Sequence, residues 1–173
     1  MDAFRILHEK GVLMLYKNVL VPFDDSDHAR SALHTAIDLV GDDAAACIHV
    51  VMVVSSDIMP PSMLAAPSVI SDTFMDYQNY EAMLAAMTER SNKELHDNVH
   101  AILGQDANHL AARLVVEARL SPSPVDGISA YASEHDCDLI VMGRRGLGAL
   151  RGMLGSVSYG VLRTAEIPVL TVK

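Results

Sequence analysis

The chain has 173 residues, half of them hydrophobic, and a formal net charge of −9 at pH 7. That length suits one domain with a packed core, and the acidic balance argues against a surface that binds nucleic acid. No stretch has the length and apolar content of a membrane span or the pattern of a secretory signal. Two cysteines without a C-x-x-C pair favour a reducing compartment, so a cytoplasmic location is expected.

The first predicted elements are a strand and a helix. Residues 1–15 are assigned to an N-terminal extension, with Met14 as an alternative start, and a single domain is predicted over residues 16–173. Residues 17–23 form an apolar run rich in β-branched side chains, typical of a buried strand. Apolar residues then recur three and four apart over positions 29–40, after a run of capping residues and before a glycine. This spacing predicts a helix with one buried face.

Strands and helices then alternate along the chain. In order, the sequence predicts a strand at 45–54, a long loop at 55–76, a helix at 77–103, a strand centred on 114–116, a helix from the Pro-bearing turn at 121–127 to about 135, a strand at 137–143, a glycine-rich loop at 143–158 leading into a helix, and a last strand at 167–172. The 55–76 loop is interpreted either as a functional flap or as an inserted segment.

This alternation predicts an α/β fold: an open five-stranded parallel sheet with helices on both faces. The expected strand order is 3-2-1-4-5, which reverses between the first and fourth strands, and ligands of such sheets bind beyond the carboxyl ends of strands at that point. Asp24 and Gly143 directly follow those two strands. Both are therefore expected at one crevice.

The loop at 143–158 holds five of the ten glycines and stands between a strand and a helix. Glycines allow close backbone approach to a phosphate, and the amides of a helix N-terminus point at the anion. The loop lacks the Gly-Lys-Ser/Thr of a Walker motif and the ordered glycines of a dinucleotide fingerprint. A phosphate-binding loop is favoured, and a flexible connector remains the alternative.

Four segments together resemble the universal stress protein family: KNVLVPFDDSDHA, IHVV, DLIVMGRRG and GSVSYGVLRTAEIPVLTVK. The resemblance covers about residues 15–173 apart from the Pro/Met-rich loop, and it points to the subclass with the nucleotide motif G-x2-G-x9-G-Ser/Thr. It implies a fold that holds ATP or AMP and a homodimer formed through the last strand, residues 167–173. An exposed apolar edge strand also favours such pairing on physical grounds.

The resemblance implies a set of nucleotide-binding residues. Pro22 and Asp24 are expected against the nucleoside, and the backbone of Val50 against the adenine edge. Met142 and Gly143 are expected beside the ribose and phosphates. Phosphate contacts are expected from Gly146, Gly155, Ser156, Val157 and Ser158, while Arg144 and Arg145 either add charged contacts or are solvated.

The sequence departs from the family pattern at two places. Eight residues separate Gly146 from Gly155 where the motif has nine, so the loop is one residue short. The family glycine in the turn after the third strand is replaced by Leu120. The shorter loop affects the expected phosphate geometry, and Leu120 affects any ligand contact from the turn after the third strand.

The sequence offers no catalytic residue. No nucleophile has a neighbouring base and the glycine loop has no lysine, so at most slow ATP hydrolysis is expected. Capping explains the acidic residues around Asp24, and Mg²⁺ is expected only through nucleotide phosphates. His49 is expected to be a hydrogen-bonded core residue. The favoured function is a nucleotide-binding regulatory protein, with an adenylyl-transferring ATP-pyrophosphatase or a nucleotide-free dimeric scaffold as alternatives.

Overall fold

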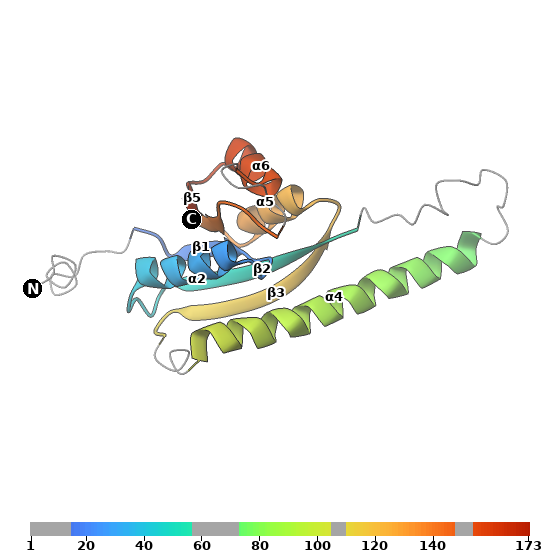
Figure 1. The fold of residues 1–173 in the computed structure, drawn as a ribbon, viewed down its shortest axis with the longest axis horizontal. Coiled ribbons are helices and arrows are strands. Elements are labelled where there is room, and N and C mark those ends of the chain that lie inside the picture. The colour runs from blue at the N-terminus through green and yellow to red at the C-terminus, as the bar shows by residue number, and fades with distance from the viewer. Residues whose placement is uncertain (1–14, 57–72, 105–109, 148–153) are drawn as a thin grey trace, which may run out of the picture.

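The computed structural model describes residues 15–56, 73–104, 110–147 and 154–173. Its five parallel strands form one sheet in the order β3-β2-β1-β4-β5, which confirms the predicted strand order (Figure 1). The strands are β1 (Asn18–Pro22), β2 (Cys47–Ser55), β3 (Arg113–Ser121), β4 (Leu139–Gly143) and β5 (Val169–Val172), and the helices are α2 (Asp27–Val40), α4 (Thr73–Leu103), α5 (Pro124–Glu134) and α6 (Ser156–Thr164).

Helices cover both faces of the sheet because successive residues of each strand point to opposite sides. One core lies under α2 and α4 and includes Val19, Val21, Leu33 and Leu95. The other core lies under α5 and α6 and includes Leu20, Val51, Ile128, Tyr131 and Val161. The two apolar clusters confirm the expectation of a sheet buried on both faces.

A serine cap and a glycine fix the ends of α2. The Ser26 hydroxyl accepts a hydrogen bond from the Ala29 N–H at 3.2 Å, which identifies Ser26 as the cap within the run of capping residues before the helix. Gly41 ends the helix at φ 54°, a backbone conformation that glycine adopts without strain. The helix therefore starts immediately beyond the end of β1, at the crevice predicted from the topology.

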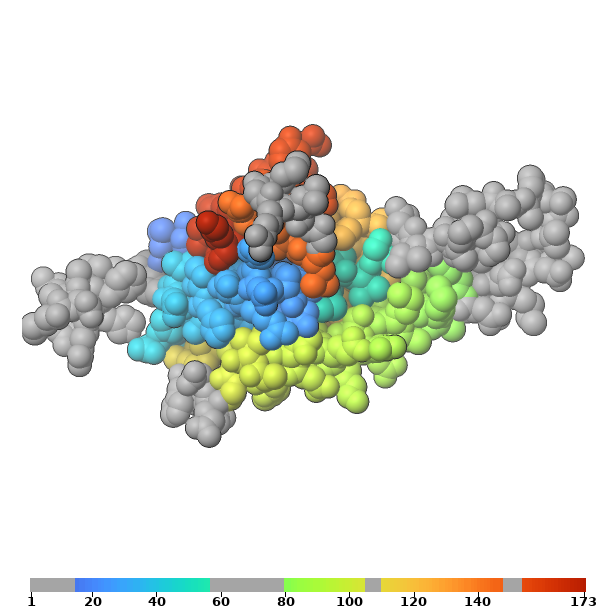
Figure 2. Space-filling model, in the orientation of Figure 1, coloured from blue at the N-terminus to red at the C-terminus, as the bar shows by residue number. Residues whose placement is uncertain are grey.

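The two edges of the sheet differ in how they are covered. On one edge, α4 runs alongside β3, and the Asn92 side-chain oxygen accepts a hydrogen bond from the Ala118 N–H at 2.9 Å (Figure 1). In the space-filling view α4 forms a band along this side of the molecule (Figure 2). At the other edge lies β5, where Leu170 is 38% exposed. The β3 edge is thus shielded by a helix and one of its N–H groups is satisfied by that helix.

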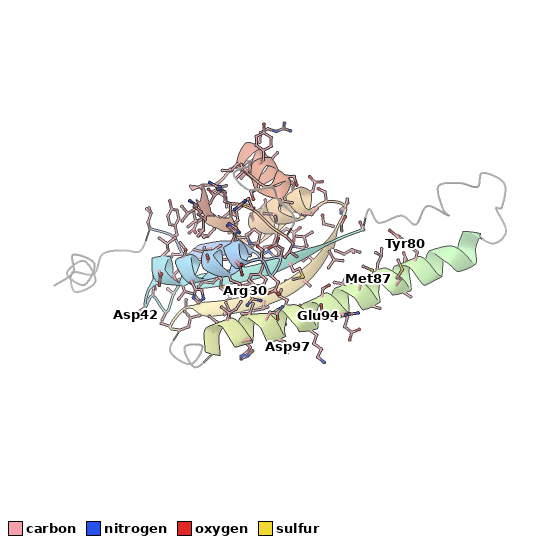
Figure 3. The ribbon with its side chains drawn as sticks, viewed as in Figure 1. Arg30, Asp42, Tyr80, Met87, Glu94 and Asp97 are labelled. Atoms are coloured by element: carbon pink, nitrogen blue, oxygen red, sulfur yellow. The ribbon has the colours of Figure 1, made fainter. Side chains whose placement is uncertain are left out.

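The helix α4 is amphipathic along its described length. Leu84, Leu95 and Val99 are buried, the last two in the core against the sheet, whereas Glu94 and Asp97 are exposed (Figure 3). Near the beginning of the helix, the Tyr80 hydroxyl donates to the Ser56 carbonyl and fastens the helix to the end of β2.

Several bounds differ from those expected from the sequence. The strand β2 extends to Ser55 and α4 begins at Thr73, because regular hydrogen bonding continues past the apolar spacing at both places. The remainder of the predicted 55–76 loop, residues 57–72, lies outside the described residues, as do residues 1–14 of the N-terminal extension. Within the described part of the chain, no helix has both the length and the apolar character needed to cross a membrane.

Candidate functional site

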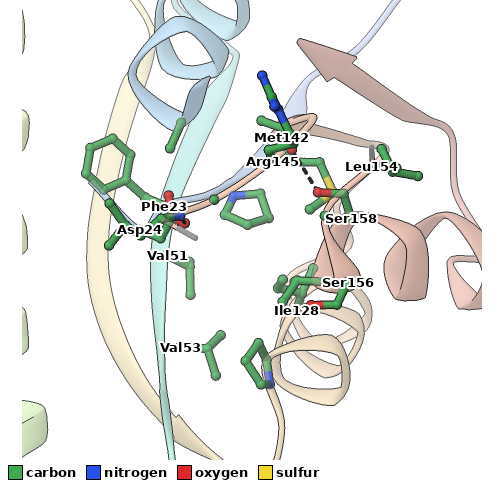
Figure 4. A pocket seen from close by; sticks show the side chains of 18 residues that line it. Phe23, Asp24, Val51, Val53, Ile128, Met142, Arg145, Leu154, Ser156 and Ser158 are labelled. Atoms are coloured by element: carbon green, nitrogen blue, oxygen red, sulfur yellow. Dashed lines mark hydrogen bonds between the residues drawn. The ribbon is translucent and has the colours of Figure 1, made fainter. Parts of the chain in front are cut away.

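A cavity of about 700 Å³ opens at the carboxyl ends of β1 and β4 (Figure 4). These two strands are neighbours, with Val19 opposite Leu139 and Leu20 opposite Ile140, and the strand order reverses between them. Asp24 and Gly143 both line the cavity. The topology and the glycine loop therefore meet at one site, as the sequence predicts.

One wall of the cavity is apolar. It consists of Pro22, Val51, Val53, Pro124 and Ile128, contributed by β1, β2 and the first turns of α5. The helix approaches β2 closely because position 127 is a glycine, where an added Cβ atom would lie 2.8 Å from the Val53 Cγ1 atom. A flat apolar group fits against such a wall.

A second part of the lining is the N-terminus of α6, which lies beside the start of α5 (Figure 4). Gly155 is the N-cap residue, its backbone is extended, and as a glycine it has no side chain with which to cap the helix. The amides of Ser156, Val157 and Ser158 belong to the first turn, where an α-helix has no internal acceptors for its N–H groups. The helix dipole and these amides together favour an anion at this wall.

Three hydrogen bonds close the two ends of the glycine loop onto the sheet. The Arg144 N–H donates to the Val172 carbonyl at 2.7 Å, and the Gly155 N–H donates to the Arg144 carbonyl at 3.0 Å. The buried Ser158 hydroxyl donates to the Gly143 carbonyl at 2.9 Å. The Gly155 N–H and the Ser158 hydroxyl hydrogen are therefore already used within the protein, although both residues line the cavity.

The Asp24 carboxylate lies on the glycine loop. Its Oδ1 atom accepts from the Ser26 N–H at 3.2 Å and its Oδ2 atom accepts from the Leu147 N–H at 3.3 Å. The same carboxylate fills the space beside Gly146, where any added Cβ atom would collide with Oδ2. Figure 4 shows Asp24 on the other side of the cavity from Ser156.

Gly143 has a packing role in addition to its place at the cavity. A Cβ atom at this position would lie 2.8 Å from the His28 Cβ atom and 2.9 Å from the His28 carbonyl carbon. The end of β4 thus packs directly on the backbone at the start of α2. Glycine is required here for that close approach, whether or not a ligand is bound.

Ten of the twelve residues that the sequence analysis names for the nucleotide site line this cavity, and Val50 and Arg144 do not. The Val50 side chain is fully buried in the core beneath α2 and α4, while Val51 faces the cavity and its carbonyl accepts the Phe23 N–H at 2.8 Å. The resemblance assigned only backbone groups of Val50 to the ligand, and that assignment stays a prediction. The Arg145 side chain points away from the apolar wall (Figure 4).

Sequence reasoning missed most of the apolar wall. Phe23, Val51, Val53, Pro124 and Ile128 line the cavity but were not among the expected residues. The alternation along β2 contained part of the signal, since Val51 and Val53 share one face of the strand. The contribution of α5 depends on how that helix packs, which no local pattern specifies.

A cluster of polar side chains lies in the core beneath α5. The His49 Nδ1 atom is 3.0 Å from the Tyr131 hydroxyl, and the Tyr131 ring stacks on His135 with ring centroids 3.8 Å apart. Burial, aided by the positive charges of His135 and Arg113, lowers the pKa of His49 from its usual 6.5 to about 4. His49 is therefore a neutral, hydrogen-bonded core residue, as expected from the sequence.

Burial also suppresses ionisation of the Tyr131 hydroxyl in this cluster and of the Cys137 thiol. It raises the pKa of the Tyr131 hydroxyl to about 12, and the negative charge of Glu117 adds to the effect. Burial likewise raises the pKa of the Cys137 thiol to about 12, assisted by Asp138. Both cysteines are free and buried. Among the described residues, no group of three or more His, Cys, Asp or Glu side chains is placed to hold a metal ion.

The fold and the position of the cavity define the protein as a doubly wound α/β protein with a cavity at the switch point of its sheet. A family model for the universal stress protein family matches residues 15–173. The chain belongs to this family.

Comparison with individual proteins agrees with this assignment. The chain is 30% identical to the universal stress protein Rv1636 of Mycobacterium tuberculosis, over 91% of this chain and 96% of that protein. It is 31% identical to a universal stress protein of Thermus aquaticus, over 92% of this chain and 100% of that protein.

Solved structures share the fold. The universal stress protein UspA of Lactobacillus plantarum superposes with a TM-score of 0.66 at 23% identity, over 91% of this chain and 98% of that chain. A universal stress protein solved in complex with cAMP has a TM-score of 0.51 at 23% identity, over 91% of this chain and 96% of that chain.

Proposed function

We propose that the cavity binds an adenine nucleotide, ATP or AMP, and that the protein acts as a regulatory or stress-response protein in the cytoplasm. The observation that carries this proposal is that an apolar wall and the N-terminus of α6, whose N-cap is a glycine, line the same cavity. The apolar wall suits a planar base, and the helix N-terminus suits a phosphate. A cAMP complex of a family member with the same fold is consistent with an adenine nucleotide.

Slow hydrolysis is the most that this site supports. The described lining residues include no lysine and no histidine, and Asp24 is the one carboxylate among them. That carboxylate already accepts two backbone N–H groups, from Ser26 and Leu147. A Mg²⁺ ion would therefore be held through the nucleotide phosphates, and the protein would contribute positioning rather than a general base.

We also propose a homodimer formed through residues 167–173. Helix α4 shields the β3 edge, and Asn92 satisfies the Ala118 N–H there. Nothing comparable is described at the β5 edge, where Leu170 is 38% exposed. The preceding helix α6 also exposes apolar side chains, Tyr159 at 58% and Leu162 at 44%. Pairing two copies of β5 across a two-fold axis would cover this surface and close the open edge.

The substitution Ser156→Asp tests nucleotide binding with little risk to the fold. Ser156 is the first residue of α6, where a negative charge stabilises the helix but repels a phosphate. We expect the affinity for ATP and AMP to fall by about tenfold or more while the melting temperature is unchanged or higher. Isothermal titration calorimetry measures the affinity, and the neutral, isosteric variant Ser156→Asn is the control.

The wild-type protein offers a complementary measurement. Mass spectrometry of the small molecules released on denaturation should detect an adenine nucleotide.

Equal affinity of Ser156→Asp and Ser156→Asn for every adenine nucleotide would place the phosphate elsewhere. Absence of binding by the wild-type protein at millimolar nucleotide would refute the proposed function.

A further inference from the structure

The turn between β1 and α2 contains a residue in a backbone conformation that side chains rarely adopt. Asp25 has a φ of 63°, which lies in the left-handed region. Aspartate tolerates this region better than most residues, but a non-glycine residue keeps such a conformation only where surrounding contacts hold it. Asp25 directly follows Asp24, which lines the cavity. The contacts that hold Asp25 therefore affect the geometry of the candidate site.

Arg30 provides those contacts from the first turn of α2 (Figure 3). Its Nη2 atom donates to the Asp25 Oδ1 atom at 2.7 Å, and its Nε atom donates to the Asp25 carbonyl at 3.4 Å. One guanidinium group thus holds both the side chain and the backbone of the same residue, which suits the planar, forked arrangement of its donors. The Arg30 N–H donates to the Ser26 carbonyl at 3.0 Å, so the arginine is itself fixed in the helix.

Asp24 lies between two residues that are held in place. On one side, the Phe23 N–H donates to the Val51 carbonyl at 2.8 Å, which attaches the end of β1 to β2. On the other side, Arg30 holds Asp25. The backbone on both sides sets the direction of the Asp24 side chain, so a change in the Asp25 conformation would move the Asp24 carboxylate.

The Asp24 carboxylate retains acceptor capacity for a ligand. Its Oδ1 atom accepts the Ser26 N–H at 3.2 Å and its Oδ2 atom accepts the Leu147 N–H at 3.3 Å. An ionised carboxylate has about four acceptor positions, so about two are left for the hydroxyl or amino groups of a ligand. The family resemblance expects this residue against the nucleoside. Its orientation therefore bears directly on ligand affinity.

We propose that Arg30 is a positioning residue, which acts through Asp25 to orient the Asp24 carboxylate toward the nucleoside of the bound ligand. This inference rests on the proposed function and adds a determinant of affinity outside the cavity, because the described lining includes Asp24 but neither Asp25 nor Arg30. The Arg30 and Asp25 side chains are 43% and 37% exposed. Ion pairs with such exposure contribute little to stability, so loss of Arg30 should weaken ligand binding much more than it destabilises the fold.

The test is the variant Arg30→Met, which removes both hydrogen bonds to Asp25 and keeps an aliphatic side chain. Isothermal titration calorimetry is performed with adenosine, which has no phosphate, and with AMP. We expect the affinity for both ligands to fall by the same factor, about threefold or more, with a nearly unchanged melting temperature. The matched control is Arg90→Met on α4, which removes an exposed ion pair with Glu94 at 2.8 Å and should leave both affinities unchanged.

A double-mutant comparison shows whether Arg30 acts through Asp24. Asp24→Ala removes the carboxylate, so Arg30→Met should cause no further loss of affinity in that background. An equal loss with and without the Asp24 carboxylate would overturn the inference. Asp25→Asn tolerates the left-handed φ and keeps an acceptor for Arg30, so it should lose less affinity than Asp25→Ala. The reverse order of these two variants would also overturn the inference.

The choice of ligands separates this inference from the proposed function. If Arg30→Met weakens the binding of AMP but not of adenosine, the arginine acts through its charge on the phosphate and the inference fails. Unchanged affinity of Arg30→Met for both ligands would also overturn it, as would wild-type binding of AMP without binding of adenosine. In each of these cases the proposed function stands. If the wild-type protein binds neither ligand at millimolar concentration, the proposed function fails and the inference falls with it.

Discussion

The Ser158 hydroxyl donates a hydrogen bond to the Gly143 carbonyl at 2.9 Å, across fifteen positions of sequence. Ser158 belongs to the first turn of α6 and Gly143 is the last residue of β4. The bond fixes the anion-favouring helix end relative to the sheet, and it is buried. The position of the proposed phosphate site therefore depends on a hydroxyl that has a structural role.

Replacing Ser158 with alanine should destabilise the protein and weaken ligand binding. The buried Gly143 carbonyl would lose its donor, which costs about 1–3 kcal/mol of unfolding free energy. Urea denaturation measures this loss. Ser156→Ala, at an exposed position in the same turn, should change stability by less than about 0.5 kcal/mol. Equal stability of the two variants would show that the bond contributes nothing to the fold.

The two glycines at the ends of the loop should respond differently to alanine. At Gly143 the new Cβ atom would meet the backbone of His28 at 2.9 Å, so overpacking should cost about 1–3 kcal/mol or more. At Gly155 the nearest atom is the Arg145 Cα at 3.3 Å and the residue has φ −66°, so Gly155→Ala should cost less than about 1 kcal/mol. Thermal and urea unfolding of both variants test this difference, and a larger loss for Gly155→Ala would contradict it.

The stability of the protein should fall as the solution becomes acidic. His49 has its pKa lowered from 6.5 to about 4 in the folded state, so the unfolded chain binds this proton more readily. The contribution of neutral His49 to the unfolding free energy is complete above pH 6.5 and is lost as the pH falls toward 4. The linkage relation gives a loss of about 2 kcal/mol between pH 7.5 and 5 from this residue.

Urea unfolding across that pH range measures the effect of His49. The variant His49→Gln keeps an acceptor for the Tyr131 hydroxyl but cannot titrate, so its stability should depend less steeply on pH. His34→Gln, at an exposed position of α2, should retain the wild-type dependence. Indistinguishable pH profiles for all three proteins would rule out His49 as the source.

The proposed dimer predicts different outcomes at the two edges of the sheet. Leu170→Lys places a charge on β5, where it would be buried between copies, and should shift the protein to monomer. Leu120→Lys changes a residue of similar exposure, 44% against 38%, on β3 and should leave the oligomeric state unchanged. Analytical ultracentrifugation distinguishes the species. A dimer that persists in Leu170→Lys but not in Leu120→Lys would assign the interface to the opposite edge.

Much of the fold was predictable because local patterns and topology agree. The β-branched run predicted β1, the three-and-four spacing predicted α2, and the alternation of strands and helices predicted the parallel sheet with helices on both faces. The switch-point rule then placed Asp24 and Gly143 at one cavity. Helix bounds were less predictable, as the start of α4 at Thr73 illustrates, since a helix can continue beyond its buried face.

The sequence by itself determined the order of the elements, the glycine loop and the end of the sheet at which the cavity lies. These features follow from periodicity and from glycine and capping chemistry, which are local. Only the tertiary structure decided which side chains form the apolar wall and which donors remain for a ligand. The Asp24 carboxylate on the Leu147 N–H and the Ser158 hydroxyl on the Gly143 carbonyl join residues far apart in the chain, and such pairings depend on packing rather than on pattern.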